Sequence, residues 1–396
     1  MDIAANDRHR VAFFLHDLRG GGVERVSVHL ANAMVRFGHH VDMVLVNRVG
    51  KPAYYEEIDR RIQLLELPQK RTLFSVIGFR EYIRKRRPTI IISALTHINV
   101  SALMAVRLLK MRPYIFVVEH SHQICRQGSG QKMGLGWAVR LAFKLVPILY
   151  RSADTVGAVS GGIRRGLVEE LRLPARQVAV LHNPVQVPNA DDLMPASLLI
   201  PWLAEKESVP YILGVGALSY EKNFSLLIEA FRQVRNRRAL RLVIAGEGPL
   251  RASLEEQARE TGFGDDILLP GFVDNPYVLM NEAAAFALTS RWEGLPTVLI
   301  EAMALGTSVV ATDCPSGPAE ILLKGQLGQL VPVDDAEAFA RAIELALEQP
   351  QDAQSLKRRA ADFLPEAAAR HYLDIYYATQ LRASDPRFVM DARDKS

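Results

Sequence analysis

The stretch SRWEGLPTVLIE, residues 290–301, decides the fold that we expect for this chain. An apolar run, residues 285–288, leads into it, and its Gly-Leu-Pro centre stands where a helix begins. A strand that ends in such a turn directs backbone N–H groups and the positive end of a helix dipole at one point, which suits a phosphate. Glu293 and Glu301 flank the turn, and their carboxylates can accept hydrogen bonds from sugar hydroxyls. The stretch therefore indicates a nucleotide-sugar site on an α/β fold.

The rest of the chain repeats this strand-turn-helix unit. Short runs that are apolar almost throughout and rich in Val and Ile are typical of parallel strands covered on both faces. In the first half we expect strands over 11–15, 41–46, 89–93, 114–118, 155–159 and 178–181, and helices over 23–37, 74–87 and 162–171. In the second half we expect strands over 211–215, 242–245, 267–269, 285–288 and 308–312, and helices over 223–235, 249–261, 296–305 and 334–348. Two successive series predict an α/β protein with two doubly wound, Rossmann-like domains.

Prolines between residues 184 and 210 interrupt any regular element and mark the join. We expect a first domain over 1–190, a linker over 191–209 and a second domain over 210–364. A last helix is expected over 365–381, followed by a polar, disordered tail over 382–396. Ligands bind at the carboxyl ends of parallel strands, so two such domains face to face would place the site in the cleft between them.

Charge is unevenly distributed along the chain. Residues 1–200 hold 28 Lys and Arg against 16 Asp and Glu, a net +12, whereas residues 201–396 hold 20 against 28, a net −8. A basic half suits an anionic partner, either a lipid surface or nucleic acid. Residues 131–151 are basic and amphipathic, so they can lie in a membrane interface or form a helix packed on their own domain; the charge favours the membrane.

Other features exclude several classes of protein. The start, residues 1–10, lacks the apolar core of a signal peptide, and no apolar run approaches the ~18 residues of a spanning helix. Cys125 and Cys314 lie far apart, without metal or redox spacing, as in a cytosolic protein with reduced thiols. The dinucleotide fingerprint G-x-G-x-x-G is absent, which disfavours a nicotinamide oxidoreductase.

Further candidate residues follow the strand ends of the second half. Gly216 ends the strand over 211–215, and Lys222, in the loop beyond it, can pair with phosphate oxygens. Gly246 and Gly248 form a second glycine turn, which fits either a ligand contact or an ordinary strand-to-helix turn. The backbone at Phe272–Val273 can face a nucleobase or form a plain turn.

The first half offers two such positions. Gly21 and Gly22 belong to a triple-glycine turn that lets a backbone approach a ligand, on the acceptor or the phosphate side; a purely structural turn is the alternative. His120 lies just past the expected strand over 114–118 and therefore at the expected cleft. It makes no metal site with the scattered carboxylates, so we expect no tightly bound metal.

These motifs resemble the retaining glycosyltransferases of family 4, which have the GT-B fold. The resemblance covers nearly the whole chain and is strongest over 211–323. Glu293 and Glu301 are similar to the family's E-x7-E pair, and residues 312–322 resemble a subgroup that builds bacterial surface polysaccharides and lipid-linked oligosaccharides. The resemblance implies two Rossmann-like domains facing a central cleft, with the C-terminal helix crossing back to the first domain.

The resemblance also implies roles for the candidate residues. Catalysis would rest on Glu293 and His120 at the donor sugar and on Lys222 at the diphosphate, while Glu301 would hold the ribose. The donor would be bound by strand-end residues of both domains: Gly21, Gly22, Gly216, Lys222, Gly246, Gly248, Phe272, Val273, Glu293, Gly294, Leu295, Pro296, Thr297 and Glu301.

One position departs from the family pattern. The family usually has an arginine directly after the glycine strand end, and this chain has Ala217 there. Arg291 and Arg25 are candidates to replace the missing cation. A charge-assisted contact contributes roughly 1.5–3 kcal/mol, so its loss corresponds to about ten-fold or more in donor affinity.

The expected activity is the transfer of a hexose or N-acetylhexosamine from a nucleotide-diphosphate sugar, a UDP-sugar, to a lipid-linked saccharide acceptor, with retention and without a metal or other cofactor. The expected partners are the nucleotide sugar, the acceptor and an anionic membrane surface that the basic first domain contacts, and not nucleic acid. This places the protein in the cytoplasm, peripheral on the inner face of the membrane. Two alternatives stay open: a UDP-sugar epimerase on the same fold, and a non-catalytic sugar-nucleotide-binding protein.

Overall fold

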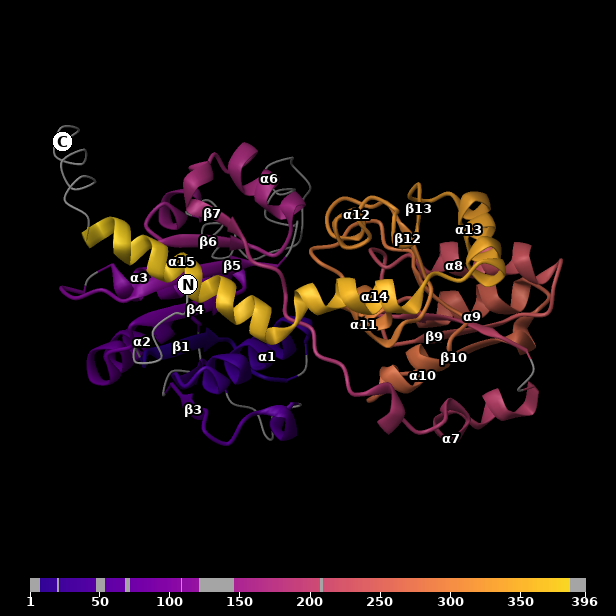
Figure 1. Cartoon of the computed structure of the whole chain (residues 1–396), viewed down its shortest axis with the longest axis horizontal. Coiled ribbons are helices and arrows are strands. Elements are labelled where there is room, and N and C mark those ends of the chain that lie inside the picture. The colour runs from indigo at the N-terminus through magenta and orange to yellow at the C-terminus, as the bar shows by residue number, and fades with distance from the viewer. Residues whose placement is uncertain are drawn as a thin grey trace. The chain divides into compact units, whose positions relative to one another are not determined.

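A computed structural model of the chain describes residues 8–19, 21–47, 54–67, 72–107, 109–120, 146–206 and 209–384. The chain divides into two compact units (Figure 1). The first contains residues 1–159, 163–184 and 364–396, and the second contains residues 160–162 and 185–363. Each unit is built on one parallel sheet, which confirms the predicted α/β class with two Rossmann-like domains.

The first unit has a seven-stranded sheet in the order β3-β2-β1-β4-β5-β6-β7, and every pair of neighbours is parallel. Strands β1, β4 and β5 are almost wholly buried, as expected where helices cover both faces. The strand order reverses between β1 and β4, the kind of switch point at which such folds bind ligands. The strands are β1 Arg10–Leu15, β2 His40–Leu45, β3 Gln63–Glu66, β4 Ile90–Ala94, β5 Tyr114–Glu119, β6 Thr155–Ala158 and β7 Val178–Val180.

Helices of the first unit come from both ends of the chain. They are α1 Gly22–Arg36, α2 Thr72–Arg86, α3 Thr96–Val106, α6 Gly161–Glu169 and α15 Pro365–Ser384, with 3-10 turns η1 Tyr55–Glu57 and η2 Ala175–Gln177. The predicted last helix thus exists and runs to Ser384. It belongs to the first unit, as Figure 1 shows in yellow, and its Tyr376 ring packs on Tyr114 of β5.

The second unit has a six-stranded parallel sheet in the order β10-β9-β8-β11-β12-β13. Its order reverses between β8 and β11, so the loops after these two strands meet at the second switch point. The strands are β8 Tyr211–Val215, β9 Arg241–Ala245, β10 Ile267–Gly271, β11 Ala285–Leu288, β12 Val309–Thr312 and β13 Gln329–Val331.

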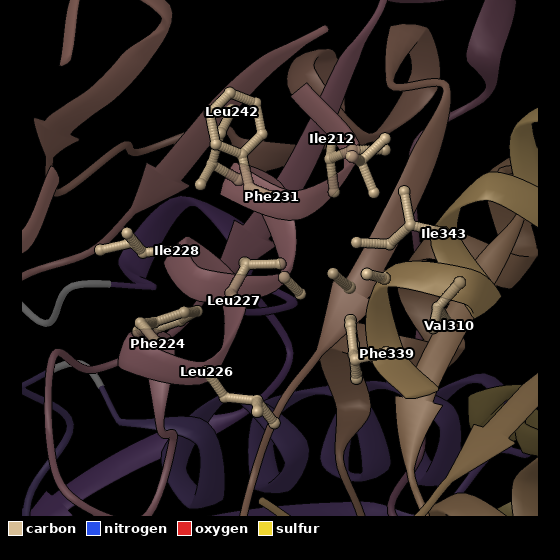
Figure 2. Close-up of a cluster of buried hydrophobic side chains, with 14 of the residues drawn as sticks. Ile212, Phe224, Leu226, Leu227, Ile228, Phe231, Leu242, Val310, Phe339 and Ile343 are labelled. Carbon is tan, nitrogen blue, oxygen red and sulfur yellow. The ribbon is translucent and has the colours of Figure 1, made fainter. Parts of the chain in front are cut away.

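Helices α8 and α13 cover one face of this second sheet. Figure 2 shows Phe231 of α8 and Phe339 of α13 packed with Ile212, Leu242 and Val310 of the strands, all fully buried. Burying each such side chain stabilises the fold by roughly 1.5–3 kcal/mol. The helices of the unit are α7 Ala196–Leu199, α8 Phe224–Arg235, α9 Arg251–Glu260, α10 Pro276–Glu282, α11 Thr297–Leu305, α12 Pro318–Ile321, α13 Ala336–Glu348 and α14 Ala353–Ala360, with η3 Ala190–Asp192, η4 Pro201–Lys206, η5 Gly264–Asp266 and η6 Ala361–Phe363.

The segment expected to be a linker, 191–209, contains α7 and η4 and belongs to the second unit, whose main part is Val185–Phe363. Arg241 of β9 holds η4: its buried guanidinium lies 3.2 Å from the Trp202 ring centroid and donates a 2.5 Å hydrogen bond to the Trp202 carbonyl. This cation–π contact fixes the chain that enters the second unit.

Several elements were not expected: strands β3 and β13, and helices α3, α7, α10, α12 and α14. Strands β3 and β13 are short edge strands that begin with Gln, and helix α3 is buried over nearly its whole length, so none has a clear amphipathic pattern. Most of the predicted amphipathic segment, residues 131–145, lies outside the described residues. No helix in the described ranges is long and apolar enough to cross a membrane.

Candidate functional site

The switch point of the second unit joins two of the predicted catalytic residues. Lys222 follows β8 and Glu293 follows β11, and the Lys222 Nζ lies 2.5 Å from Glu293 Oε1. Ser290 Oγ donates a 2.7 Å hydrogen bond to the same oxygen. Among the described residues, none donates a hydrogen bond to Glu293 Oε2. One carboxylate oxygen is therefore held in place, and the other can accept a ligand hydroxyl.

The turn after Glu293 presents unsatisfied backbone donors. The N–H groups of Gly294, Leu295 and Thr297 make no hydrogen bond to any residue that the structure describes. Helix α11 begins at Thr297. We predicted Pro296 as its first residue, but Pro296 is the N-cap, and its ring supplies no side-chain hydrogen bond to the helix. Free amides at a helix start, beside the Lys222 ammonium, form an anion site of the kind that holds phosphate.

The E-x7-E carboxylates occupy different places. Glu293 lies in the turn, whereas Glu301 is on α11, more than one turn further along, and is buried. Of the residues expected near a base, Phe272 is 74% exposed and Val273 is half-buried, directly after β10. An exposed phenylalanine at the carboxyl end of a strand offers a ring face for stacking.

The glycines of the neighbouring loops have a packing reason of their own. A Cβ on Gly246 would lie 1.8 Å from the Gly216 carbonyl oxygen, and a Cβ on Gly248 would lie 2.4 Å from the Leu218 carbonyl oxygen. The loops after β8 and β9 therefore approach each other backbone to backbone, which only glycine permits. A Cβ on Gly216 would lie 3.7 Å from the Lys222 stem, an ordinary van der Waals distance, so this glycine has no such steric reason.

Both arginines considered as replacements for the one missing at Ala217 already have partners. Arg291 pairs with Asp334 at 2.9 Å and lies 4.2 Å from the Tyr220 ring centroid. Arg25, in the first unit, pairs with Glu57 at 3.0 Å. A phosphate would therefore compete with these contacts for the guanidinium group of either arginine.

In the first unit, His120 follows β5 as predicted. Its pKa is lowered to about 4 by burial, which outweighs a hydrogen bond with Asn183 that favours the charged ring. None of the described residues forms a hydrogen bond with the buried Nδ1. A neutral imidazole with a free ring nitrogen can bind a sugar hydroxyl.

Gly21 and Gly22 lie at the start of α1, with Gly21 as the N-cap. A Cβ on Gly21 would meet the Glu24 carboxylate at 2.2 Å. Glu24 hydrogen-bonds to the Gly21 backbone, as in a capping box, and burial raises its pKa. The sequence analysis missed this carboxylate, although a Gly-x-x-Glu helix start signals it.

The side chain next to His120 belongs to a buried polar network. Glu119 accepts hydrogen bonds from Asn99 (3.0 Å), Thr96 (3.2 Å) and Tyr150, and Ser93 donates to Asn99 at 2.7 Å. Burial raises the pKa of Glu119 to about 7. Sequence reasoning missed this network because its members come from four separate segments.

Side chains behind the Lys222–Glu293 pair were also missed. Thr289 donates to the Lys222 carbonyl at 2.9 Å, and Thr312 donates to the Ser290 carbonyl at 2.6 Å. Cys314 is buried nearby, and burial, with the Glu293 charge, raises its pKa to about 12. Among the described residues no group of three or more His, Cys, Asp or Glu could hold a metal ion.

Comparison with known proteins agrees with this geometry. Residues 20–187 match the family model described as Glycosyltransferase Family 4, and residues 200–363 match the model described as Glycosyl transferases group 1. The chain belongs to the glycosyltransferases, with a family 4 domain followed by a group 1 domain.

Among family 4 relatives, an N-acetylgalactosamine-N,N'-diacetylbacillosaminyl-diphospho-undecaprenol 4-alpha-N-acetylgalactosaminyltransferase of Campylobacter jejuni is 28% identical over 89% of this chain and 93% of its own. The amylovoran biosynthesis glycosyltransferase AmsD of Erwinia amylovora is 26% identical over 90% of this chain and 95% of its own. Anabaena Alr3699/HepE, solved with UDP and glucose, superposes with a TM-score of 0.75 at 16% identity, over 94% of this chain and 100% of its own. The likeness shows the GT-B fold.

Proposed function

We propose that this family 4 enzyme transfers a hexose or N-acetylhexosamine from a UDP-sugar to a lipid-linked saccharide, with retention, in the assembly of a bacterial surface glycan. The observation that carries the proposal is the Lys222–Glu293 pair beside the free amides of Gly294, Leu295 and Thr297. The names of two relatives support the substrate classes: the Campylobacter enzyme is named for an undecaprenol-linked acceptor, and the Anabaena structure holds UDP and glucose.

In this proposal the diphosphate is the group that the site stabilises. As the bond between sugar and diphosphate breaks, negative charge develops on the leaving phosphate oxygens. Lys222 has two further N–H donors for these oxygens, and the amides of Gly294, Leu295 and Thr297 supply fixed dipoles. No metal is needed for this neutralisation, so we propose a metal-independent transfer.

The two glutamates hold opposite ends of the donor. Glu293 Oε2 would accept a sugar hydroxyl, and Glu301 would accept the ribose hydroxyls from its place on α11. A hydrolase that retains configuration needs carboxyl groups ~5–5.5 Å apart across the scissile bond. Here the acceptor would instead attack on the leaving-group face, without a covalent enzyme intermediate. His120 would contact the donor sugar, and the Gly21–Gly22 turn the donor phosphate and acceptor.

Titration calorimetry with UDP tests the site. The Glu301→Ala variant should lose detectable UDP binding, whereas Glu348→Ala, an exposed glutamate at the end of α13, should bind as the wild type does. Equal UDP affinity in both variants would refute the assignment. Product formed from UDP-sugar alone would indicate an epimerase instead.

We further propose that the enzyme works as a peripheral protein on the cytoplasmic face of the membrane. A lipid-linked acceptor lies in that surface, and the first 200 residues carry a net charge of +12 from 28 basic and 16 acidic residues. Sedimentation of the wild-type protein with inner-membrane vesicles tests this location; recovery entirely in the supernatant would contradict it.

A further inference from the structure

One edge of the first unit's sheet gathers basic side chains. Because all seven strands are parallel, each is entered from the same edge, here called the amino edge. The connections that enter β4 to β7 carry exposed arginines and lysines: Arg84, Lys85, Arg86 and Arg87 before β4; Arg107, Lys110 and Arg112 before β5; Arg151 before β6; and Arg172 and Arg176 before β7.

Two of these connections are direct neighbours. Strands β4 and β5 pair with Ile90 opposite Tyr114, and the Tyr114 N–H donates a 2.9 Å hydrogen bond to the Thr89 carbonyl. Helices α2 and α3, which lead into these strands, pack on each other (Figure 1). The basic residues within 84–87 and 107–112 therefore form one patch, although the two segments lie about twenty residues apart in the sequence.

Acidic neighbours neutralise only part of the patch. Lys85 pairs with Glu81 at 2.8 Å, and Arg112 pairs with Asp154 at 2.6 Å. Arg86, Arg107 and Lys110 make no ion pair within the described parts of the chain. Like charges held this close together raise the local potential and favour an anionic surface over water.

The same patch exposes an apolar side chain. Met111 is 88% exposed, and it stands between Lys110 and Arg112. A flexible thioether flanked by long cationic side chains can enter the boundary between lipid headgroups and acyl chains while the cations stay among the phosphates. An exposed apolar side chain flanked by two cations fits a lipid bilayer better than a flat acidic protein surface.

We propose that the amino edge, residues 84–87, 107 and 109–112 with the exposed Met111 among them, docks this enzyme on a bilayer of anionic phospholipid. This inference rests on the proposed peripheral location and names the surface that provides it. Strand β5, six residues long, spans about 20 Å, so the loop that carries His120 would stand about that far from the membrane. Docked in this way, the enzyme would reach the far end of a lipid-linked oligosaccharide more readily than it would reach a single sugar attached directly to the lipid diphosphate.

Vesicle flotation tests the docking surface. The full-length protein is mixed with vesicles of phosphatidylglycerol and phosphatidylcholine in equal parts, or of phosphatidylcholine alone. The Arg86→Glu/Lys110→Glu variant should partition on the order of 1,000-fold more weakly to the anionic vesicles, because the two reversals change four charges and each charge near such a surface contributes about 1 kcal/mol. The matched Arg238→Glu/Lys324→Glu variant changes the same net charge at exposed positions of the second unit and should bind like the wild type.

A rival surface is the basic stretch at 131–145, outside the described residues. If Lys132→Glu/Arg140→Glu abolishes flotation while the amino-edge variant floats like the wild type, the proposal is wrong. A thermal melt of each variant confirms folding. Transfer to a soluble, lipid-free acceptor should be equal in all variants; its absence in the wild type would count against the proposed function and not against the docking surface.

Discussion

Replacing Glu119 by Gln should remove a large part of the pH dependence of stability in the first unit. The buried carboxyl has its pKa raised from 4.5 to about 7, because desolvation disfavours the charged form. The stabilisation from the bound proton is fully present below about pH 4.5 and is lost as the pH rises through 7. A difference of about 2.5 pKa units corresponds to about 3 kcal/mol.

Gln is a close match for the protonated acid. Its carbonyl oxygen can keep the hydrogen bonds from Asn99 and Tyr150, and its amide can donate to Thr96. The variant should therefore exceed the wild type by no more than about 1 kcal/mol near pH 5 and by about 3 kcal/mol near pH 8. For a unit of this size the difference corresponds to roughly 6–12 °C in Tm.

Scanning calorimetry at pH 5 to 8 measures this difference. Burial lowers the pKa of His39 and His120 to about 4, which makes stability rise with pH up to about 6.5. Both histidines remain in the variant, so the difference between the two proteins isolates Glu119. Glu169→Gln, at an exposed position of α6, serves as the control. Parallel curves for wild type and Glu119→Gln would refute the reasoning.

Three further predictions concern the second unit and its controls. Lys222→Met should weaken UDP binding about ten- to hundred-fold by calorimetry, with exposed Lys324→Met as an inert control; equal affinities would contradict the diphosphate role. Ala217→Arg should tighten UDP binding about ten-fold at low salt, and unchanged binding would show that the exposed position lies outside the phosphate site. Gly246→Ala should destabilise the protein by about 2 kcal/mol or more in urea melts, whereas Gly22→Ala, whose added Cβ meets nothing within 4 Å, should change little.

Much of the fold could be predicted because its central strands are apolar runs of the right length. Strands such as β5 and β11 are buried along their whole length, so their composition alone marks them. Helix α3 escaped prediction because most of it is buried, polar Asn99 and Ser101 included, so it lacks the 3.6-residue apolar stripe of a helix with one exposed face. The edge strands β3 and β13 are too short and too polar to stand out.

The sequence predicted which residues belong to the candidate site, but not which of them contact one another. Lys222 and Glu293 were each chosen for their place at a strand end, but their 2.5 Å pairing depends on β8 lying next to β11. Gly246 was chosen as a ligand contact. The structure shows that a Cβ at this position would also collide with the backbone of another loop, which no local sequence pattern reveals. Long-range register, which fixes both contacts, is not encoded in any short motif.

The return of α15 to the first unit makes the second unit an insertion within the first. During synthesis, all strands of the first sheet have been made once β7 is complete. Tyr114 and Phe116 cannot pack against the α15 tyrosines, however, until the whole inserted segment, residues 185–363, has been synthesised. At 5–20 residues per second this interval is roughly 10–35 s. The second unit can therefore finish folding before the first, against the order of synthesis, and a chaperone that shields nascent sheets would act on the first unit.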